Sequence, residues 1–210
     1  MRRSPSSLAL AAVVCGCGSA PAPATPRACP TGAVTLAGQD DVAALAGCAR
    51  VESLVIRTGE ALDLAPLATL ETVAAELSVG PTVGLTELAL RGLREVGGTV
   101  KIAGNANVMG VFLPMLARAG GFDIGGNAAL TTVSLPRLET TRALALADNP
   151  ALELLDLSRL LAVEQALVIA DNGRLVLVDA PSLARAGTVR VENNKILPDE
   201  QVAALRKLAP

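Results

Sequence analysis

Short triplets with apolar outer residues and a variable middle residue recur along the chain. They are LVI 54–56, LSV 77–79, VKI 100–102, FDI 122–124, LAL 144–146, LVI 167–169 and VRV 189–191. Successive triplets start 22 or 23 residues apart. In a β-strand this alternation points the outer pair inward and the middle residue outward. A short, regular period of this kind predicts a solenoid in which each repeat is one coil.

An asparagine follows five of the triplets by three residues, and the five are Asn105, Asn127, Asn149, Asn172 and Asn194. Asn tolerates a left-handed turn, so it suits a corner that every coil must make. Its amide can also bond the turn and the neighbouring coil, which predicts a structural ladder of stacked asparagines. The alternative is a row of amides that binds a ligand.

A second apolar phase follows each corner, with the shared pattern L-x-x-[LV]-x-[LA]-x-x-L. It is found at 85–93, 108–116, 130–138, 152–160 and 175–183. Pro114, Pro136 and Pro181 exclude a regular helix there. The predicted fold is therefore mainly β: a right-handed parallel β-helix or leucine-rich solenoid of about seven coils with short helical caps, because each coil buries its apolar lining only by stacking.

Two segments are expected to cap the array over residues 29–210. In the N-terminal cap, 29–50, AVTL 33–36 predicts a first strand and GQDDVAALAGCARV a short helix, with Asp40 as N-cap and Gly47 near its end. In the C-terminal cap, 195–210, the stretch 197–208 predicts an amphipathic helix with Pro at N1. Its residues Val202, Leu205 and Leu208 would cover the last coil; a partner-binding helix is the alternative.

The first 28 residues indicate where in the cell the protein is located. Two arginines precede the apolar run Leu8 to Val14, which is the layout of a secretory signal peptide. The ending VCGC resembles a bacterial lipobox and predicts a signal peptide over 1–16 and lipidation of Cys17, although Cys15 in the box departs from the usual pattern. An ordinary cleaved signal and a twin-arginine signal are the alternatives. The Ala/Pro-rich stretch 17–28 would be an extended tether.

Cysteines and charge narrow the functional classes. Outside the signal segment the pair Cys29 and Cys48 remains, and in an exported chain it predicts a disulfide rather than two free thiols. The chain contains no His, the commonest general base and metal ligand. Its formal net charge of −2 and the lack of a basic patch argue against nucleic-acid binding. We predict no cofactor and no metal.

Two outward features of the second phase carry the candidate chemistry. Asp156 and Asp179 occupy equivalent positions in adjacent coils, so they could act as an acid pair or simply form a solvated surface. Phe112 falls outside the inward phase and, with Met109, could anchor a partner; cover by a neighbouring loop is the alternative. Asp148 and Asp171 invite a calcium interpretation, but no Gly-Asp nonapeptide supports it.

The array resembles the receptor L domain, a leucine-rich module of receptor ectodomains that is also found in bacterial surface lipoproteins. The resemblance lies in Cys29, the GC at 47–48 followed by VESLVI, the stretch EVGGTVKIAGNANV at 95–108, and the Asn after each strand. After the first two triplets RTG and GPT stand instead of that Asn. The resemblance implies a module that presents faces to a partner.

Together these features predict a non-enzymatic cell-envelope lipoprotein of the outer membrane, facing the periplasm or the cell surface. It would be held to the membrane by its N-terminal lipid and would bind an unknown protein or surface glycan, serving in adhesion or envelope scaffolding. The alternative is a carboxylate-based enzyme that acts on glycans.

Overall fold

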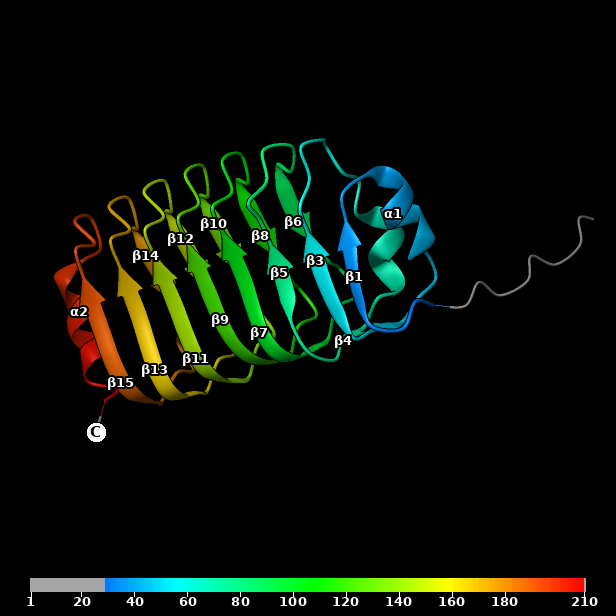
Figure 1. Ribbon diagram of the computed structural model, residues 1–210. Helices are drawn as coiled ribbons and strands as arrows, with labels where there is room; N and C mark the ends of the chain where they lie inside the picture. The colour runs from blue at the N-terminus through cyan, green and yellow to red at the C-terminus, as the bar shows by residue number, and fades with distance from the viewer. Residues whose placement is uncertain (1–28, 210) are drawn as a thin grey trace, which may run out of the picture.

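The computed structural model describes residues 29–209 and shows a parallel β-solenoid (Figure 1). The larger sheet, sheet A, has ten strands and the order β1-β3-β5-β7-β9-β11-β13-β15, with β2 and β4 beside this path. The strands on the path are β1 (Ala33–Leu36), β3 (Ser53–Ile56), β5 (Leu77–Val79), β7 (Glu95–Ala103), β9 (Arg118–Gly125), β11 (Thr140–Ala147), β13 (Ala162–Ala170) and β15 (Arg185–Glu192). The two short ones are β2 (Arg50–Val51) and β4 (Thr72–Val73).

The second apolar phase forms a separate sheet behind the first. Sheet B has the order β14-β12-β10-β8-β6, and all its pairs are parallel. Its strands are β6 (Glu87–Ala89), β8 (Gly110–Phe112), β10 (Thr132–Ser134), β12 (Leu154–Asp156) and β14 (Leu177–Asp179). The first coil differs, because a 3-10 helix, η1 (Ala65–Thr69), stands where the later coils have a sheet B strand. Pro66 in its first turn has the fixed φ that suits a helix start.

The register confirms the inward and outward assignment of the triplets. Their middle residues are Cα partners from coil to coil, starting with Val55, Ser78 and Lys101 and ending at Arg190. The outer residues are buried, apart from Val189, which is half-buried at the C-terminal end. The leucines and valines at the inward positions of the second phase, such as Val111 and Leu135, are buried against them. One continuous aliphatic core therefore runs through the stack.

The long strands of sheet A extend beyond the triplets toward the preceding corner. The register shifts by one residue between Val96 and Thr99 in β7 and between Val163 and Ala166 in β13, so each of these strands has a bulge. The backbones lie close together at this bend: a Cβ on Gly120 would come within 2.8 Å of the carbonyl oxygens of two residues in the preceding coil. Glycine is therefore required there by close approach.

The asparagines form the expected ladder. Asn127 shows the pattern: its Nδ2 donates to Ile102 O at 2.9 Å in the preceding coil and to Asn149 Oδ1 at 2.9 Å in the next. Its Oδ1 accepts from the backbone N of Asn105 at 3.2 Å and from Asn105 Nδ2 at 2.8 Å. Four of the five, from Asn105 to Asn172, are fully buried, so their amides serve the stack and are not available to a ligand.

The left-handed turn belongs to the residue before each ladder asparagine and not, as expected, to the asparagine itself. Positive φ values near 60° occur at the equivalent positions Gly104, Gly126, Asp148, Asp171 and Asn193. The ladder requires the following side chain to point inward, and the left-handed residue turns the chain to achieve this. Glycine, Asp and Asn are the residues that adopt this conformation at least cost, which explains the repeated ADN.

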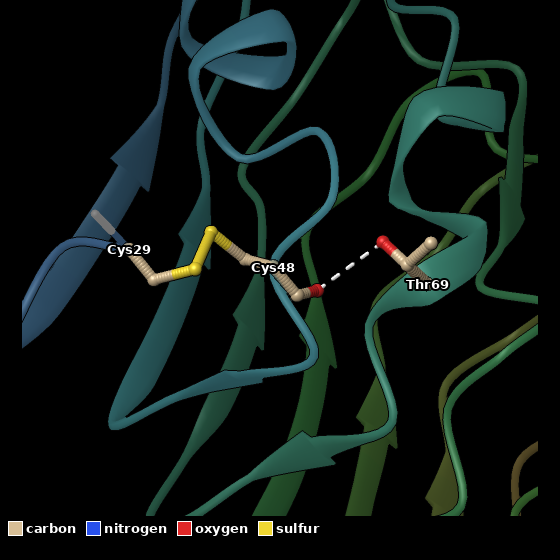
Figure 2. The surroundings of a disulfide bond; sticks show 3 residues. All are labelled: Cys29, Cys48 and Thr69. Carbon is tan, nitrogen blue, oxygen red and sulfur yellow. Dashed lines mark hydrogen bonds between the residues drawn. A yellow bond between two sulfur atoms is a disulfide. The ribbon is translucent and has the colours of Figure 1, made fainter. Parts of the chain in front are cut away.

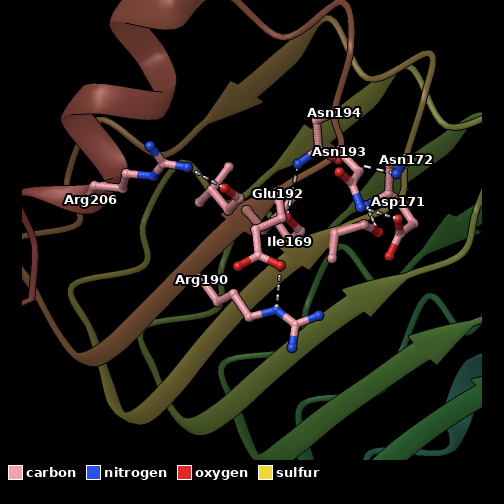
Figure 3. A network of polar contacts seen from close by, with 10 residues as sticks. Ile169, Asp171, Asn172, Arg190, Glu192, Asn193, Asn194 and Arg206 are labelled. Atoms are coloured by element: carbon pink, nitrogen blue, oxygen red, sulfur yellow. Dashed lines mark hydrogen bonds and ion pairs between the residues drawn. The ribbon is translucent and has the colours of Figure 1, made fainter.

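The ladder begins abruptly at its N-terminal end. Thr82 stands one coil before Asn105, and both Thr82 Oγ1 and Asn105 Oδ1 are buried without a hydrogen-bond partner. At the other end Asn194 Nδ2 donates to Ile169 O at 2.8 Å, and Asn193 Nδ2 bonds Asp171 Oδ1 at 2.7 Å (Figure 3). The ladder therefore spans coils three to seven, as the sequence pattern predicts.

The N-terminal cap is built from a short helix and a disulfide. Helix α1 (Gln39–Ala44) buries Val42 over the first coil, and Gly47, with φ 86°, follows it. The disulfide joins Cys29 to Cys48, and the carbonyl of Cys48 accepts a hydrogen bond from Thr69 Oγ1 at 3.3 Å (Figure 2). The disulfide is confirmed and indicates an oxidising compartment of the kind that exported proteins occupy.

The sequence predicts Asp40 as the N-cap of α1, and this prediction is wrong: Asp40 lies in the first turn, and the N-cap is Gly38. Asp41, in the first turn, accepts hydrogen bonds at its Oδ2 from the backbone N of Ala37 at 2.9 Å and of Gly38 at 3.0 Å. These bonds lower the pKa of the Asp41 carboxyl, the bond from Ala37 most, although burial opposes them. Asp41 is the N3 residue, so its bond from the N-cap Gly38 N is the half of a capping box in which the N3 side chain accepts from the N-cap backbone.

The C-terminal cap is α2 (Asp199–Arg206), with Pro198 as N-cap rather than at N1. Leu205 is buried, and Val202 and Leu208 pack against the core as expected. Gln201 Oε1 accepts from Val178 N at 3.0 Å, and the Arg206 guanidinium donates to Val191 O at 2.7 Å (Figure 3). The helix therefore covers the last strands of both sheets.

The predicted signal peptide over 1–16, the lipidated Cys17 and the tether over 17–28 lie outside the described residues. Between residues 29 and 209, neither helix has the length or the apolar character needed to traverse a bilayer.

Candidate binding face

The outer surfaces of the two sheets differ in the size of their side chains. On sheet A the outward positions of the central strands are mostly Gly and Ala, such as Gly121, Ala143, Ala145 and Ala166. On sheet B the register aligns two outward columns of larger and more varied residues. The first column is Glu87, Gly110, Thr132, Leu154 and Leu177, and the second is Ala89, Phe112, Ser134, Asp156 and Asp179.

Phe112 points out of the core from strand β8, as the sequence predicts, but it is half-buried. Its ring lies over Gly110 of the same strand, where any Cβ would overlap the ring atoms. The contact with Gly110 accounts for part of this burial. The result is an aromatic ring lying along the outer surface of sheet B.

Other apolar side chains accompany Phe112 on this face. Leu177 is 43% exposed, and Leu154, its Cα partner, is half-buried. Met109 is 55% exposed and Val176 47% exposed, and both immediately precede a sheet B strand. We call these five residues the apolar cluster. Exposed large hydrophobic side chains that gather on one face are typical of interaction surfaces.

Asp156 and Asp179 lie side by side as Cα partners on the same face, as predicted. Ser134 Oγ donates to Asp156 Oδ2 at 2.9 Å, and Ser158 donates to Asp156 Oδ1 from both its backbone N, at 3.1 Å, and its hydroxyl. The Ser158 hydroxyl also lies 3.4 Å from Asp179 Oδ2. The serines thus hold the first carboxylate rigidly and connect it to the second.

This arrangement supplies hydrogen-bond acceptors beside an apolar surface. Sequence reasoning found the two acids but missed Ser134, Ser158, Leu154 and Leu177. Ser134, Leu154 and Leu177 lie in the two outward columns, and reading each column across the coils would have found them. Ser158 lies two residues beyond Asp156, outside both columns.

The calcium interpretation gains no geometric support. Asp148 and Asp171 hold the left-handed corners, and Asp171 accepts a hydrogen bond from Asn193. Among residues 29–209, no three His, Cys, Asp or Glu side chains gather closely enough to hold a metal ion.

No protein-family model, curated protein or solved structure matches this chain. The resemblance to the receptor L domain therefore stays a prediction from the sequence.

Proposed function

We propose that the protein is a non-enzymatic cell-envelope lipoprotein whose solenoid binds a protein partner through the outer face of sheet B. The observation that carries the proposal is the apolar cluster: Leu154 and Leu177 lie on the adjacent strands β12 and β14, with Val176 at their edge. Phe112 and Met109 extend this surface at β8, beyond the polar outward residues Thr132 and Ser134 of β10. Such side chains supply the buried centre of an interface.

The neighbouring polar groups favour a peptide or protein as the partner. Asp156 and Asp179 lie next to the cluster in the second column, so a partner segment that pairs an apolar side chain with a basic one would match both. The resemblance to receptor L domains, which implies face presentation, agrees with this proposal. The disulfide supports an exported location, and Cys17 is the proposed site of the lipid anchor.

Crosslinking in intact cells, followed by capture of the full chain, tests the proposal. Phe112→Asp should lower the yield of one defined crosslinked partner at least tenfold, since central aromatic anchors contribute 2 kcal/mol or more. Val168→Asp is the matched control, because Val168 is a half-buried outward residue on β13 of sheet A, the opposite sheet. Equal loss in both variants, or no loss in Phe112→Asp, would refute binding through sheet B.

Two further measurements address the remaining parts of the proposal. Mass spectrometry of the mature N-terminus should find an acylated cysteine at position 17; an unmodified start after position 20 would refute the anchor. The glycan-acting alternative predicts hydrolysis that is lost in Asp156→Asn and Asp179→Asn, and such a loss would replace the binding function with an enzymatic one.

A further inference from the structure

A cluster of arginines surrounds a shallow cleft at the corner where each coil returns from sheet B to sheet A. The cleft has a volume of about 310 Å³ and is lined by Arg94, Arg118, Arg137 and Arg159 together with Glu95 and Glu139. Its lining carries a formal charge of +2, from four arginines and two glutamates. The whole chain has a formal net charge of −2, so the charge of the cleft is opposite in sign to the net charge of the protein.

The stacking of the coils brings the arginines together. Arg137 and Arg159 each stand three residues after a paired sheet B position, Ser134 and Asp156, so they occupy equivalent places one coil apart. Such neighbours lie about 5 Å apart along the stack. Arg118 begins the adjoining strand β9 and is the Cα partner of Glu95. Three guanidinium groups therefore line the cleft: those of Arg137 and Arg159 from the segments that follow sheet B strands, and that of Arg118 from the start of β9.

The floor of the cleft is a small residue between long ones. Ala117 N donates to Arg94 O at 2.9 Å, and Glu139 N donates to Ala117 O at 3.1 Å, so Ala117 lies between these two residues in the stack. Its methyl group leaves open the space that a longer side chain would fill. The hollow therefore depends on the small side chain at position 117.

The arginines are weakly engaged with the rest of the protein. Arg94 faces Glu71 at 3.6 Å, with both side chains more than half exposed, and such pairs contribute little. Arg118, Arg137 and Arg159 make no ion pair with any residue between 29 and 209. Their guanidinium groups are free to bind an anion, and the fork of donors on each one matches the oxygens of a phosphate.

We propose that this cleft binds a phosphate group, with the headgroup of an anionic phospholipid and free phosphate as its two possible sources. The described chain starts on the same edge: Cys29 lies beside Arg50, and the register connects Arg50 through Thr72 and Glu95 to Arg118 (lower edge in Figure 1). A chain held to a membrane by residues before 29 would bring this edge toward the lipid surface. The lipid source rests on the proposed membrane anchor, whereas the proposal as a whole does not depend on the sheet B face, which lies on other residues.

Binding of the full chain to vesicles tests the lipid source. Vesicles of phosphatidylglycerol with phosphatidylcholine are compared with pure phosphatidylcholine, and the variant Arg137→Gln with Arg159→Gln is compared with the native chain. The variant should partition about 30-fold less onto the anionic vesicles, since each arginine near such a surface contributes about a fivefold factor. Arg174→Gln with Arg190→Gln is the control, because it removes the same charge from exposed sites elsewhere.

Titration with inorganic phosphate, followed by NMR of the arginine Nε–H groups, tests the free source. Saturable shifts of Arg118, Arg137 and Arg159 that disappear in Ala117→Leu, which fills the hollow, would assign the site to free phosphate. Vesicle binding that is lost in Ala117→Leu as well as in the arginine double variant, without shifts on titration with phosphate, would assign the site to lipid headgroups; vesicle binding that persists in Ala117→Leu would place it outside the cleft and overturn the proposal. Equal weakening in the two double variants, or no response to either probe, would overturn the proposal.

Discussion

Removing one central rung of the asparagine ladder should destabilise the protein far more than removing an exposed asparagine near the corner of the preceding coil. Asn127 makes four side-chain hydrogen bonds, with lengths between 2.8 and 3.2 Å, and is fully buried. Asn107, in the preceding coil, makes one, from Nδ2 to Val83 O at 2.6 Å, and is exposed. The two substitutions to Ala delete the same atoms, so they differ mainly in burial and bonding.

The magnitude follows from the bonds lost. At about 1 kcal/mol net for each hydrogen bond, Asn127→Ala should cost about 4 kcal/mol. Asn105 Nδ2 keeps its bond to Val79 O and Asn149 Oδ1 keeps its bond from the backbone N of residue 127, but the buried backbone N of Asn105 loses its acceptor, so this sum is a lower bound. Asn107→Ala should cost about 0.5 kcal/mol, the lower end for an exposed bond.

The terminal rung provides an intermediate case. Asn194 is half-buried and makes two side-chain bonds, accepting from Asn172 N at 3.1 Å and donating to Ile169 O at 2.8 Å. Asn194→Ala should therefore cost about 2 kcal/mol. The order of the three costs is a sharper test than any single value.

Urea unfolding followed by far-UV circular dichroism measures these costs; the chain has no Trp or Tyr to serve as a fluorescence probe. Because a solenoid can open locally, amide hydrogen exchange around Asn105 should show whether the loss is confined to neighbouring coils. If Asn127→Ala and Asn107→Ala differ by less than 1 kcal/mol, the ladder does not stabilise the stack and the reasoning is refuted.

Three other predictions concern the caps and the core. Cys48→Ser should lower the free energy of unfolding by about 3 kcal/mol, because the Cys29–Cys48 disulfide closes a segment with a sequence separation of 19; a native protein whose urea midpoint is unchanged by reductant would contradict this. Leu135→Ala should cost 2 to 5 kcal/mol by the same assay, whereas Leu161→Ala, at a site 52% exposed, should cost about 0.5 kcal/mol or less. Since the pKa of Asp41 is lowered in the folded state, its contribution is present above the ordinary Asp value and is lost as the pH falls from there through the lowered folded-state pKa; Asp41→Asn should therefore show a smaller loss of thermal stability on acidification, and an unchanged pH profile would count against the helix-capping role.

The apolar periodicity was enough to predict the fold because burial fixes it. Each triplet must turn two apolar side chains inward, and any shift of one residue would expose them. The strand AVTL 33–36, the disulfide and the C-terminal cap helix follow from equally local rules. Where burial does not determine the local structure, the sequence predicts it less well. The bulged starts of the long strands, as at Val96 to Thr99, consist of residues without apolar alternation, so their register could not be predicted.

The candidate face shows the same limit. That Phe112 points outward could be predicted from its neighbours, but its position over Gly110 depends on a pair of residues two apart whose relation only the coordinates reveal. The bonds of Ser134 and Ser158 to Asp156 likewise depend on which side chains stacking brings within reach. Sequence patterns set the phase of each position, whereas contacts between coils decide what the outward positions do together.

Functional hypotheses for a solenoid are best drawn from the places where outward repetition fails. Inward positions repeat because each coil must cover the next, so their regularity reports stability alone. Outward positions carry no such requirement, and solvent tolerates many side chains there. An aromatic ring placed on a glycine, and arginines gathered around Ala117, are departures that stacking does not require. They lie on different surfaces of the coil, so one molecule has room for a protein on sheet B and a phosphate-bearing surface at its arginine edge.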